Sequence, residues 1–85
     1  MFFVYILKSK KDGKLYLGYT NDLRKRFKEH NLGLVSSTNL RRPFHLVYYE
    51  AYNSQQDATK REHNLKLRAK VLRQLKNRIE FSLKT

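Results

Sequence analysis

The pattern of hydrophobic positions predicts two strands, a helix, a third strand and two further helices. The apolar, β-branched and aromatic runs "FFVYIL" and "LYLGY" flank the turn signal Asp12-Gly13, which is typical of a β-hairpin. The run "HLVYYEAY" predicts the third strand, with Val47 and Tyr49 on one face. By the same alternation, Leu46 and Tyr48 are expected on the opposite face.

The hairpin brings two tyrosines to one face of the sheet. With a four-residue loop, Ser9 pairs with Lys14 and Tyr5 lies opposite Gly18, whereas a two-residue loop shifts the pairing by two. Both registers put Tyr5, Tyr16 and Gly18 on the same face, because side chains alternate with period two. Gly18 leaves an open space beside one ring. This arrangement fits ordinary aromatic packing, and it also fits a shared site.

The first helix is expected to begin at the N-cap Asn21, with Asp22 in its first turn, and to end near residue 30 or 31. Its inward positions, spaced i, i+3, i+4, i+7, are Leu23, Arg26, Phe27 and His30. Two of these positions are polar, although the other cations of the helix fit a solvated face. One explanation is that Arg26 extends its charge to water and His30 caps the helix end. The alternative is that both face a functional site.

The second helix also turns a charge inward. Ser54 and Asp57 fit a capping pattern, so we expect the helix to start there. Its inward positions are Ala58, Arg61, Glu62 and Leu65. A carboxylate at Glu62 needs a partner, which is either an arginine or a metal or catalytic site. The segment from residue 32 to 44 has no clear hydrophobic period and reads as a long loop. The run "RAKVLRQLKNRIEFSL" predicts a third amphipathic helix with a basic outer face.

The charge of the chain favours a polyanionic partner. Its 85 residues include 19 Lys and Arg against 7 Asp and Glu, a net charge of +12. Nucleic acid fits best, since no helix combines a broad apolar face with interfacial aromatics as membrane-surface helices do, although a merely solvated surface stays open. The absence of cysteine, of a basic leader and of a membrane-spanning apolar run predicts a cytoplasmic protein.

Polar residues from three predicted elements suit the cleavage of a phosphodiester. They are Tyr5 and Tyr16 from the hairpin, Arg26 and His30 from the first helix, and Glu62 from the second. Such a reaction needs a base to activate water, a cation for the charge on the phosphate, and a carboxylate to hold Mg²⁺. Their convergence in the fold would make a catalytic site.

The sequence resembles the GIY-YIG endonuclease superfamily, in particular its short single-domain bacterial branch. The resemblance covers nearly the whole chain as one domain, residues 1–85, through "VYILKSKKDGKLYLGYTNDLRKRFKEHN", "STNLRRPFHLVYYE" and "DATKREHNLK". Val4-Tyr5-Ile6 matches the first motif and Tyr16-Leu17-Gly18 the second, with Val4 in place of glycine and Leu17 in place of isoleucine. Arg26 and His30 match the arginine and histidine of the following helix, and Glu62 matches the metal-binding glutamate.

The resemblance implies an α+β fold, a small three-stranded antiparallel sheet flanked by helices in the order ββαβαα. It also implies hydrolysis of DNA with one divalent metal, Mg²⁺ or Mn²⁺, in a setting such as DNA repair. A tyrosine, Tyr5 or Tyr16, would accept the proton of the water, and Arg26 would bind the scissile phosphate. His30 would relay a proton or orient the phosphate, and Glu62 would hold the metal.

Some features of the family pattern are less well matched. Asn64 and Asn77 are both candidates for the asparagine that many members use. The chain carries no additional DNA-binding domain, so specificity is expected to be low or to come from DNA structure or a partner protein. Further nucleic-acid contacts are expected from Lys8, Lys14, Thr38, Arg41 and Arg42. A non-catalytic DNA- or RNA-binding module on the same fold is the alternative function.

Overall fold

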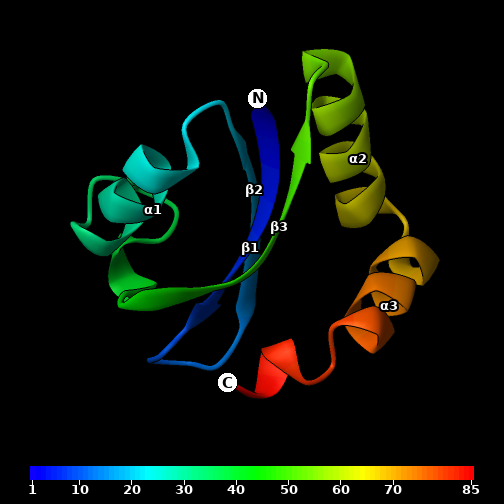
Figure 1. The fold of residues 1–85 in the computed structure, drawn as a ribbon. Coiled ribbons are helices and arrows are strands. Elements are labelled where there is room, and N and C mark those ends of the chain that lie inside the picture. Colours follow the sequence, from blue (N-terminus) through cyan, green and yellow to red (C-terminus); the bar gives the residue numbers. More distant parts are fainter.

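The computed structural model describes all 85 residues and arranges them in three layers. The elements are β1 (Phe2–Ser9), β2 (Leu15–Thr20), α1 (Leu23–Asn31), the 3₁₀ turn η1 (Asn39–Arg41), β3 (Phe44–Tyr52), α2 (Gln55–Leu67), α3 (Ala69–Arg78) and the 3₁₀ turn η2 (Ser82–Lys84). The strands form one antiparallel sheet in the order β2-β1-β3. Helix α1 covers one face, and α2 and α3 cover the other (Figure 1). The predicted α+β fold and its order ββαβαα are confirmed.

The hairpin adopts the register of the four-residue loop. Tyr5 lies opposite Gly18, and the Ser9 N–H donates to the Lys14 carbonyl at 3.0 Å. Within the loop, the Ser9 hydroxyl oxygen accepts two backbone N–H bonds. Gly13 takes the left-handed conformation with φ of 72°, which glycine adopts at little cost. The two-residue alternative is therefore excluded.

The ring of Tyr5 crosses β2 above Gly18. A Cβ atom added to Gly18 would lie 2.3 Å from both the Cζ and the Oη of Tyr5. Gly18 therefore provides the space that the sequence suggested, and Tyr5 fills it. Tyr5 belongs to the central strand β1, and its hydroxyl therefore extends toward the β2 edge of the sheet.

A β-bulge in β3 overturns the predicted alternation of faces. Tyr48 pairs with Ile6 but Leu46 pairs with Leu7, so one additional residue, Val47, lies between the two pairs. Val47 and Tyr48 both pack on the side of α2 and α3, whereas Leu46 packs with the apolar cluster beneath α1. The prediction that Leu46 and Tyr48 share a face is wrong because a strict period of two cannot accommodate the bulge.

Helix α1 begins one residue later than predicted. Asp22, not Asn21, is the N-cap, and its Oδ1 accepts the Lys25 N–H at 3.1 Å. At the other end, Gly33 has φ of 77°, and the Leu34 N–H donates to the Glu29 carbonyl at 3.0 Å. This is a Schellman termination, which needs a left-handed residue after the helix. The predicted inward positions do face the sheet, and the other cations of α1 are exposed.

Helices α2 and α3 close the opposite face around a second apolar cluster. Ser54 is the N-cap of α2 as predicted, but its side chain makes no capping hydrogen bond. Ala58 and Leu65 are buried against β1 together with residues of α3. Helix α3 is shorter than the predicted apolar stripe, and Ile79 and Leu83 lie beyond its end. No helix of the chain combines the length and hydrophobicity that a membrane crossing requires.

Gly18→Ala is expected to destabilise the protein. The new methyl group would overlap the Tyr5 ring, and such overpacking typically costs about 1–3 kcal/mol. Gly13→Ala is the control, because no atom lies within 4 Å of a Cβ at that position and only its left-handed backbone is strained. Urea unfolding of the two variants and the wild type measures the difference. A Gly18→Ala variant no less stable than Gly13→Ala would contradict the packing of Tyr5 across β2.

Candidate active site

The Tyr5 hydroxyl and the His30 imidazole form the buried centre of the candidate site. Tyr5 Oη and His30 Nε2 are 2.9 Å apart, which joins the central strand to the last turn of α1. The Tyr16 ring lies against both residues, with its centroid 6.5 Å from that of Tyr5 and 5.0 Å from that of His30. Three of the predicted site residues, drawn from the hairpin and from α1, are therefore in contact.

Thr38 completes a chain of hydrogen bonds that starts at Tyr5. The Thr38 hydroxyl donates to the Val35 carbonyl at 3.4 Å, and its oxygen lies 2.7 Å from His30 Nδ1. Because the Thr38 proton is directed to Val35, the oxygen accepts from Nδ1–H, and Nε2 is left to accept from Tyr5. His30 is therefore assigned as the neutral imidazole protonated at Nδ1. This series of hydrogen bonds ends at the Val35 backbone carbonyl and leads to no solvent-exposed proton acceptor. Its role is therefore to orient the Tyr5 hydroxyl.

Burial corrects two sequence predictions. The side chains of His30 and Thr38 are fully buried. Thr38 therefore cannot contact nucleic acid as predicted, and His30 cannot orient a phosphate directly. Both residues instead hold the Tyr5 hydroxyl in place. No pattern in the sequence indicates this role for Thr38, because it lies in the segment without a hydrophobic period.

The two tyrosines differ in their environment. Burial raises the pKa of Tyr5 from 10.0 to about 12, because the opposing effect of Arg26 is smaller and the groups of Tyr16 and Glu62 raise it further. Tyr5 therefore keeps its proton near neutral pH and donates a hydrogen bond. Tyr16 is half-buried. Its hydroxyl makes no hydrogen bond within the protein and is not buried, so it is open to solvent. Of the two, Tyr16 is the tyrosine that a water molecule or a phosphate can reach.

Arg26 lines an open groove between the end of β2 and the first turns of α1. The groove has a volume of about 410 Å³. The Arg26 side chain is 37% exposed, and its Nη1 lies 3.2 Å from Oε1 of Glu29, one turn later on the same helix. The guanidinium is near enough to Tyr5 to affect its pKa, although its well-formed side-chain hydrogen bond is the one to Glu29. Arginine has five N–H donors, so it can bind a phosphate and keep that ion pair.

Glu62 belongs to α2, which covers the opposite face of the sheet. It lies on α2 between the buried residues Ala58 and Leu65, and its side chain is 22% exposed. Its Oε2 pairs with Nζ of Lys66 at 3.0 Å, so the partner is a lysine of the same helix and not an arginine. The Glu62 carboxylate is close enough to contribute to the raised pKa of Tyr5. The convergence of the three elements on one catalytic site stays a prediction.

A metal ion at this site would depend on Glu62. No group of three or more His, Cys, Asp or Glu side chains is arranged to hold one. Glu62 offers hard oxygen atoms, and its ionic partner is a flexible, half-exposed lysine that a divalent cation can replace. Mg²⁺ commonly takes one or two carboxylates and completes its shell with water and substrate phosphate. The donor set therefore fits Mg²⁺ or Mn²⁺ bound together with a nucleic acid.

Glu50 on β3 is a second inward carboxylate, which the sequence reasoning missed. It accepts hydrogen bonds from the hydroxyls of Tyr48 and Tyr52 and from Arg61 Nε at 2.9 Å. Burial alone would raise the pKa of Glu50, but the bonds from Arg61 and the tyrosines outweigh it and hold the pKa below 4.5. Because the carboxylate is fully partnered, this network joins β3 to α2 and offers no open ligand position. The inward position of Arg61 on α2 was the one feature of the sequence that indicated a buried acidic partner.

The remaining predicted nucleic-acid contacts are scattered. Lys8 donates to a carbonyl of the C-terminal turn at 2.5 Å, on the side away from Tyr5. Arg41 pairs with Asp12 at 2.8 Å, which staples η1 to the hairpin loop. Lys14 and Arg42 are exposed. Of these cations, Lys8 is therefore separated from the candidate site by the sheet.

The asparagine with a clear role is one that the sequence reasoning did not consider. The Asn31 side chain donates to the Phe44 carbonyl at 3.0 Å and accepts the Phe44 N–H at 2.7 Å. It thereby ties the end of α1 to the start of β3. Asn64 is half-buried on α2 and Asn77 is exposed on α3. Neither takes part in a side-chain hydrogen bond comparable to that of Asn31.

Stability is expected to fall as the pH drops below neutrality. Burial, with a further contribution from Arg26, lowers the pKa of His30 below 6.5 in the folded protein. Above pH 6.5 both states hold a neutral imidazole, whereas at lower pH the unfolded chain takes up a proton that the folded chain resists. One such group contributes at most about 1.4 kcal/mol per pH unit. Urea unfolding between pH 7.5 and 5.5 measures this slope.

The variant His30→Gln isolates that contribution. Glutamine can accept from Tyr5 and donate to Thr38, but it does not titrate, so the pH slope should become shallower. His63→Gln removes an exposed histidine of α2 and should keep the wild-type slope. Equal slopes for the wild type and His30→Gln would show that the neutral imidazole is not what the fold requires.

Comparisons with known proteins identify the family of this chain. Residues 1–78 match the GIY-YIG catalytic domain family. The chain is 47% identical over 79 residues to a UPF0213 protein of Staphylococcus aureus (strain Mu3 / ATCC 700698), covering 89% of this chain and 95% of that protein. UPF0213 protein SAUSA300_0465 of Staphylococcus aureus (strain USA300) gives the same identity and coverage.

A solved structure extends the similarity to the whole fold. The solution NMR structure of the UPF0213 protein BH0048 from Bacillus halodurans superposes with a TM-score of 0.59 at 34% sequence identity. The alignment covers 100% of this chain and 95% of that one. The family match also spans every element that supplies the candidate site, from β1 to α2. The chain therefore belongs to the GIY-YIG catalytic domain family, a family of nucleases.

Proposed function

We propose that this protein is a metal-dependent endonuclease that hydrolyses DNA phosphodiester bonds at the β2 edge of the sheet. One observation carries the proposal. Arg26 and Glu62 come from opposite faces of the sheet, carry opposite charges and are both near enough to Tyr5 to affect its pKa. Each is paired with a neighbour on its own helix and not with the other. A cationic and an anionic side chain, both partly exposed, are thus left unpaired with each other in the vicinity of Tyr5.

Arg26 is suited to the phosphate. Its guanidinium is partly exposed in the groove at the end of β2, and its planar fork matches two phosphate oxygens. As water attacks phosphorus, negative charge grows on the non-bridging oxygens, and a fixed guanidinium stabilises that charge. The pair with Glu29 holds Arg26 in place without using all its donors.

Glu62 is suited to a divalent cation. Mg²⁺ or Mn²⁺, when bound, neutralises charge on the phosphate and lowers the pKa of a bound water. Glu62 would hold it through one carboxylate, with Lys66 released to solvent or to the DNA. The family is generally metal-dependent, which agrees with this assignment.

The two tyrosines have different roles in the hydrolysis. A bond forms from the water oxygen to phosphorus while the bond to the leaving oxygen breaks. The proton lost by the water passes through the Tyr16 hydroxyl to solvent, and the leaving oxygen takes a proton from solvent. Tyr16, whose hydroxyl is open, is the group that accepts a hydrogen bond from that water. Tyr5, held protonated by burial and bonded to His30, positions the Tyr16 ring through their contact.

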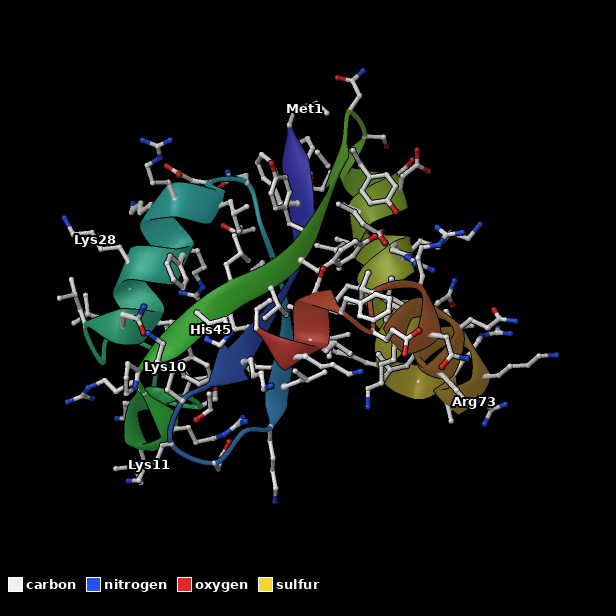
Figure 2. The ribbon with its side chains drawn as sticks, turned by 60° about the horizontal axis from the view of Figure 1, so that its bottom comes forward. Met1, Lys10, Lys11, Lys28, His45 and Arg73 are labelled. Atoms are coloured by element: carbon white, nitrogen blue, oxygen red, sulfur yellow. The ribbon has the colours of Figure 1, made fainter.

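The basic surface supplies affinity without sequence preference. The net charge of +12 is distributed widely, since Lys28 points away from the sheet on α1, Lys10 and Lys11 lie at the hairpin tip, and Arg73 projects from α3 (Figure 2). Contacts of this kind bind phosphates by displacing counterions. We therefore expect the shape of the DNA or a partner protein to determine where it is cut.

Arg26→Ala should abolish most cleavage while leaving most DNA binding. Removing one preorganised donor to a transition-state charge typically costs about 10²–10³ in rate. The assay uses end-labelled single-stranded, nicked, branched and duplex DNA with Mg²⁺ or Mn²⁺. Lys28→Ala removes the same charge from the outer face of α1 and is the matched control. If Arg26→Ala cuts as fast as Lys28→Ala, Arg26 belongs to the solvated surface.

Glu62→Gln should lose divalent-dependent cleavage and keep its stability. The lost ion pair with Lys66 is a partly exposed i, i+4 contact, which contributes only about 0.3–0.5 kcal/mol. Glu80→Gln, at an exposed position beyond α3, is the control. Melting temperature and cleavage are measured on the same samples. A Glu62→Gln variant that still cuts with Mg²⁺ would rule out the metal role, and a wild type that binds but never cuts would favour a non-catalytic DNA- or RNA-binding module.

A further inference from the structure

An apolar cleft lies between α1 and the sheet, on the other side of the first turn of α1 from the Arg26 groove. Its volume is about 490 Å³, within the range of roughly 300–1,000 Å³ that small-molecule sites occupy. The apolar residues that line it are Phe3, Leu23, Phe27, Leu46 and Tyr49. It is therefore a second candidate site, distinct in chemistry from the polar groove.

The cleft presents aromatic surface that the fold does not cover. Tyr49 stands on the edge strand β3 with 53% of its surface exposed. Its ring meets that of Phe3 edge-on, with centroids 6.0 Å apart. The buried cluster beneath α1 consists of Tyr5, Leu7 and Phe44, so it does not include Tyr49. Exposed aromatic rings of this kind are the platforms on which unpaired bases stack.

Charge indicates what kind of molecule would enter. Arg24 lines the cleft, and Asn21 and Asp22 line both the cleft and the Arg26 groove. The Asp22 carboxylate accepts the Lys25 N–H as the helix cap, and the neighbouring cations Arg24 and Lys25 are both exposed. The two sites are contiguous around the start of α1, and cations flank both. The ligand that matches the apolar cleft and the adjoining cationic groove is a flat ring carried on a phosphate backbone.

We propose that this cleft is a stacking subsite for an unpaired nucleobase of a strand whose phosphate lies at Arg26. The inference rests on the proposed nucleic-acid site and specifies its substrate as single-stranded, flapped or locally unpaired. A base inside a duplex has both faces covered by its neighbours, so it cannot stack on Tyr49 without leaving the helix.

The test measures binding without metal, so it does not depend on cleavage. Fluorescein-labelled 12-residue oligothymidylate and an abasic 12-residue strand with the same phosphates are titrated by anisotropy in EDTA. The wild type should bind the base-carrying strand at least about five-fold more tightly, the lower end of what one stacked base contributes. Tyr49→Thr, which keeps a strand-forming residue, should bring this ratio close to one. Tyr49→Phe should retain it.

Two controls separate the subsite from general affinity. Phe81→Ala removes an aromatic ring that is 75% exposed in the C-terminal turn, and it should leave the ratio unchanged. Arg26→Ala, which removes one cation of many, should keep most of the binding to both strands and leave the ratio unchanged. A wild-type ratio near one, or a ratio unchanged in Tyr49→Thr, overturns the subsite and leaves the cleft to another occupant such as an apolar segment of a partner protein. A preserved ratio in a protein that never cuts would instead refute the proposed function alone.

Discussion

The hydrogen bond between Tyr5 and His30 is the constraint on which the rest of the site depends. It joins the central strand to α1 at a point where neither side chain reaches water. A buried imidazole and phenol are tolerated only if every polar atom has a partner, and Thr38 supplies the last one. The orientation of α1 on the sheet is therefore fixed by a polar chain as well as by apolar packing. Any shift of the helix would leave buried groups unpaired.

That constraint positions Arg26 as well. His30 and Arg26 are one turn apart on the same stripe of α1, so a helix held at His30 delivers Arg26 to the β2 edge. On the opposite face, the buried residues Ala58 and Leu65 hold α2 in the same way and deliver Glu62. Gly18 allows the Tyr5 hydroxyl to cross β2. The two helices touch the site from different layers, which explains how an 85-residue chain assembles it.

The sequence predicted features that depend on a repeating pattern. The hairpin face shared by Tyr5 and Tyr16 and the inward positions of α1 and α2 followed from periods of 2 and 3.6, and the structure has them. The bulge at Val47 was missed because an inserted residue leaves no mark in a short apolar run. The burial of Thr38 was not predicted, because Thr38 lies in the segment without a period and its partner His30 belongs to α1. Side-chain pairs between different segments follow from the tertiary fold.

The ion pairs at the site explain why it stays open. Arg26 and Glu62 have opposite charges near one hydroxyl, yet each pairs with a residue three or four positions away on its own helix. Such partly exposed helical pairs contribute only about 0.3–0.5 kcal/mol, so a phosphate or a cation can replace them at little cost. A direct ion pair between Arg26 and Glu62 would be harder to break and would fill the space between the helices. The Glu50 carboxylate, which accepts five hydrogen bonds from Tyr48, Tyr52 and Arg61, illustrates the closed alternative in the same molecule. The weak local pairs thus hold both side chains in position without closing the site.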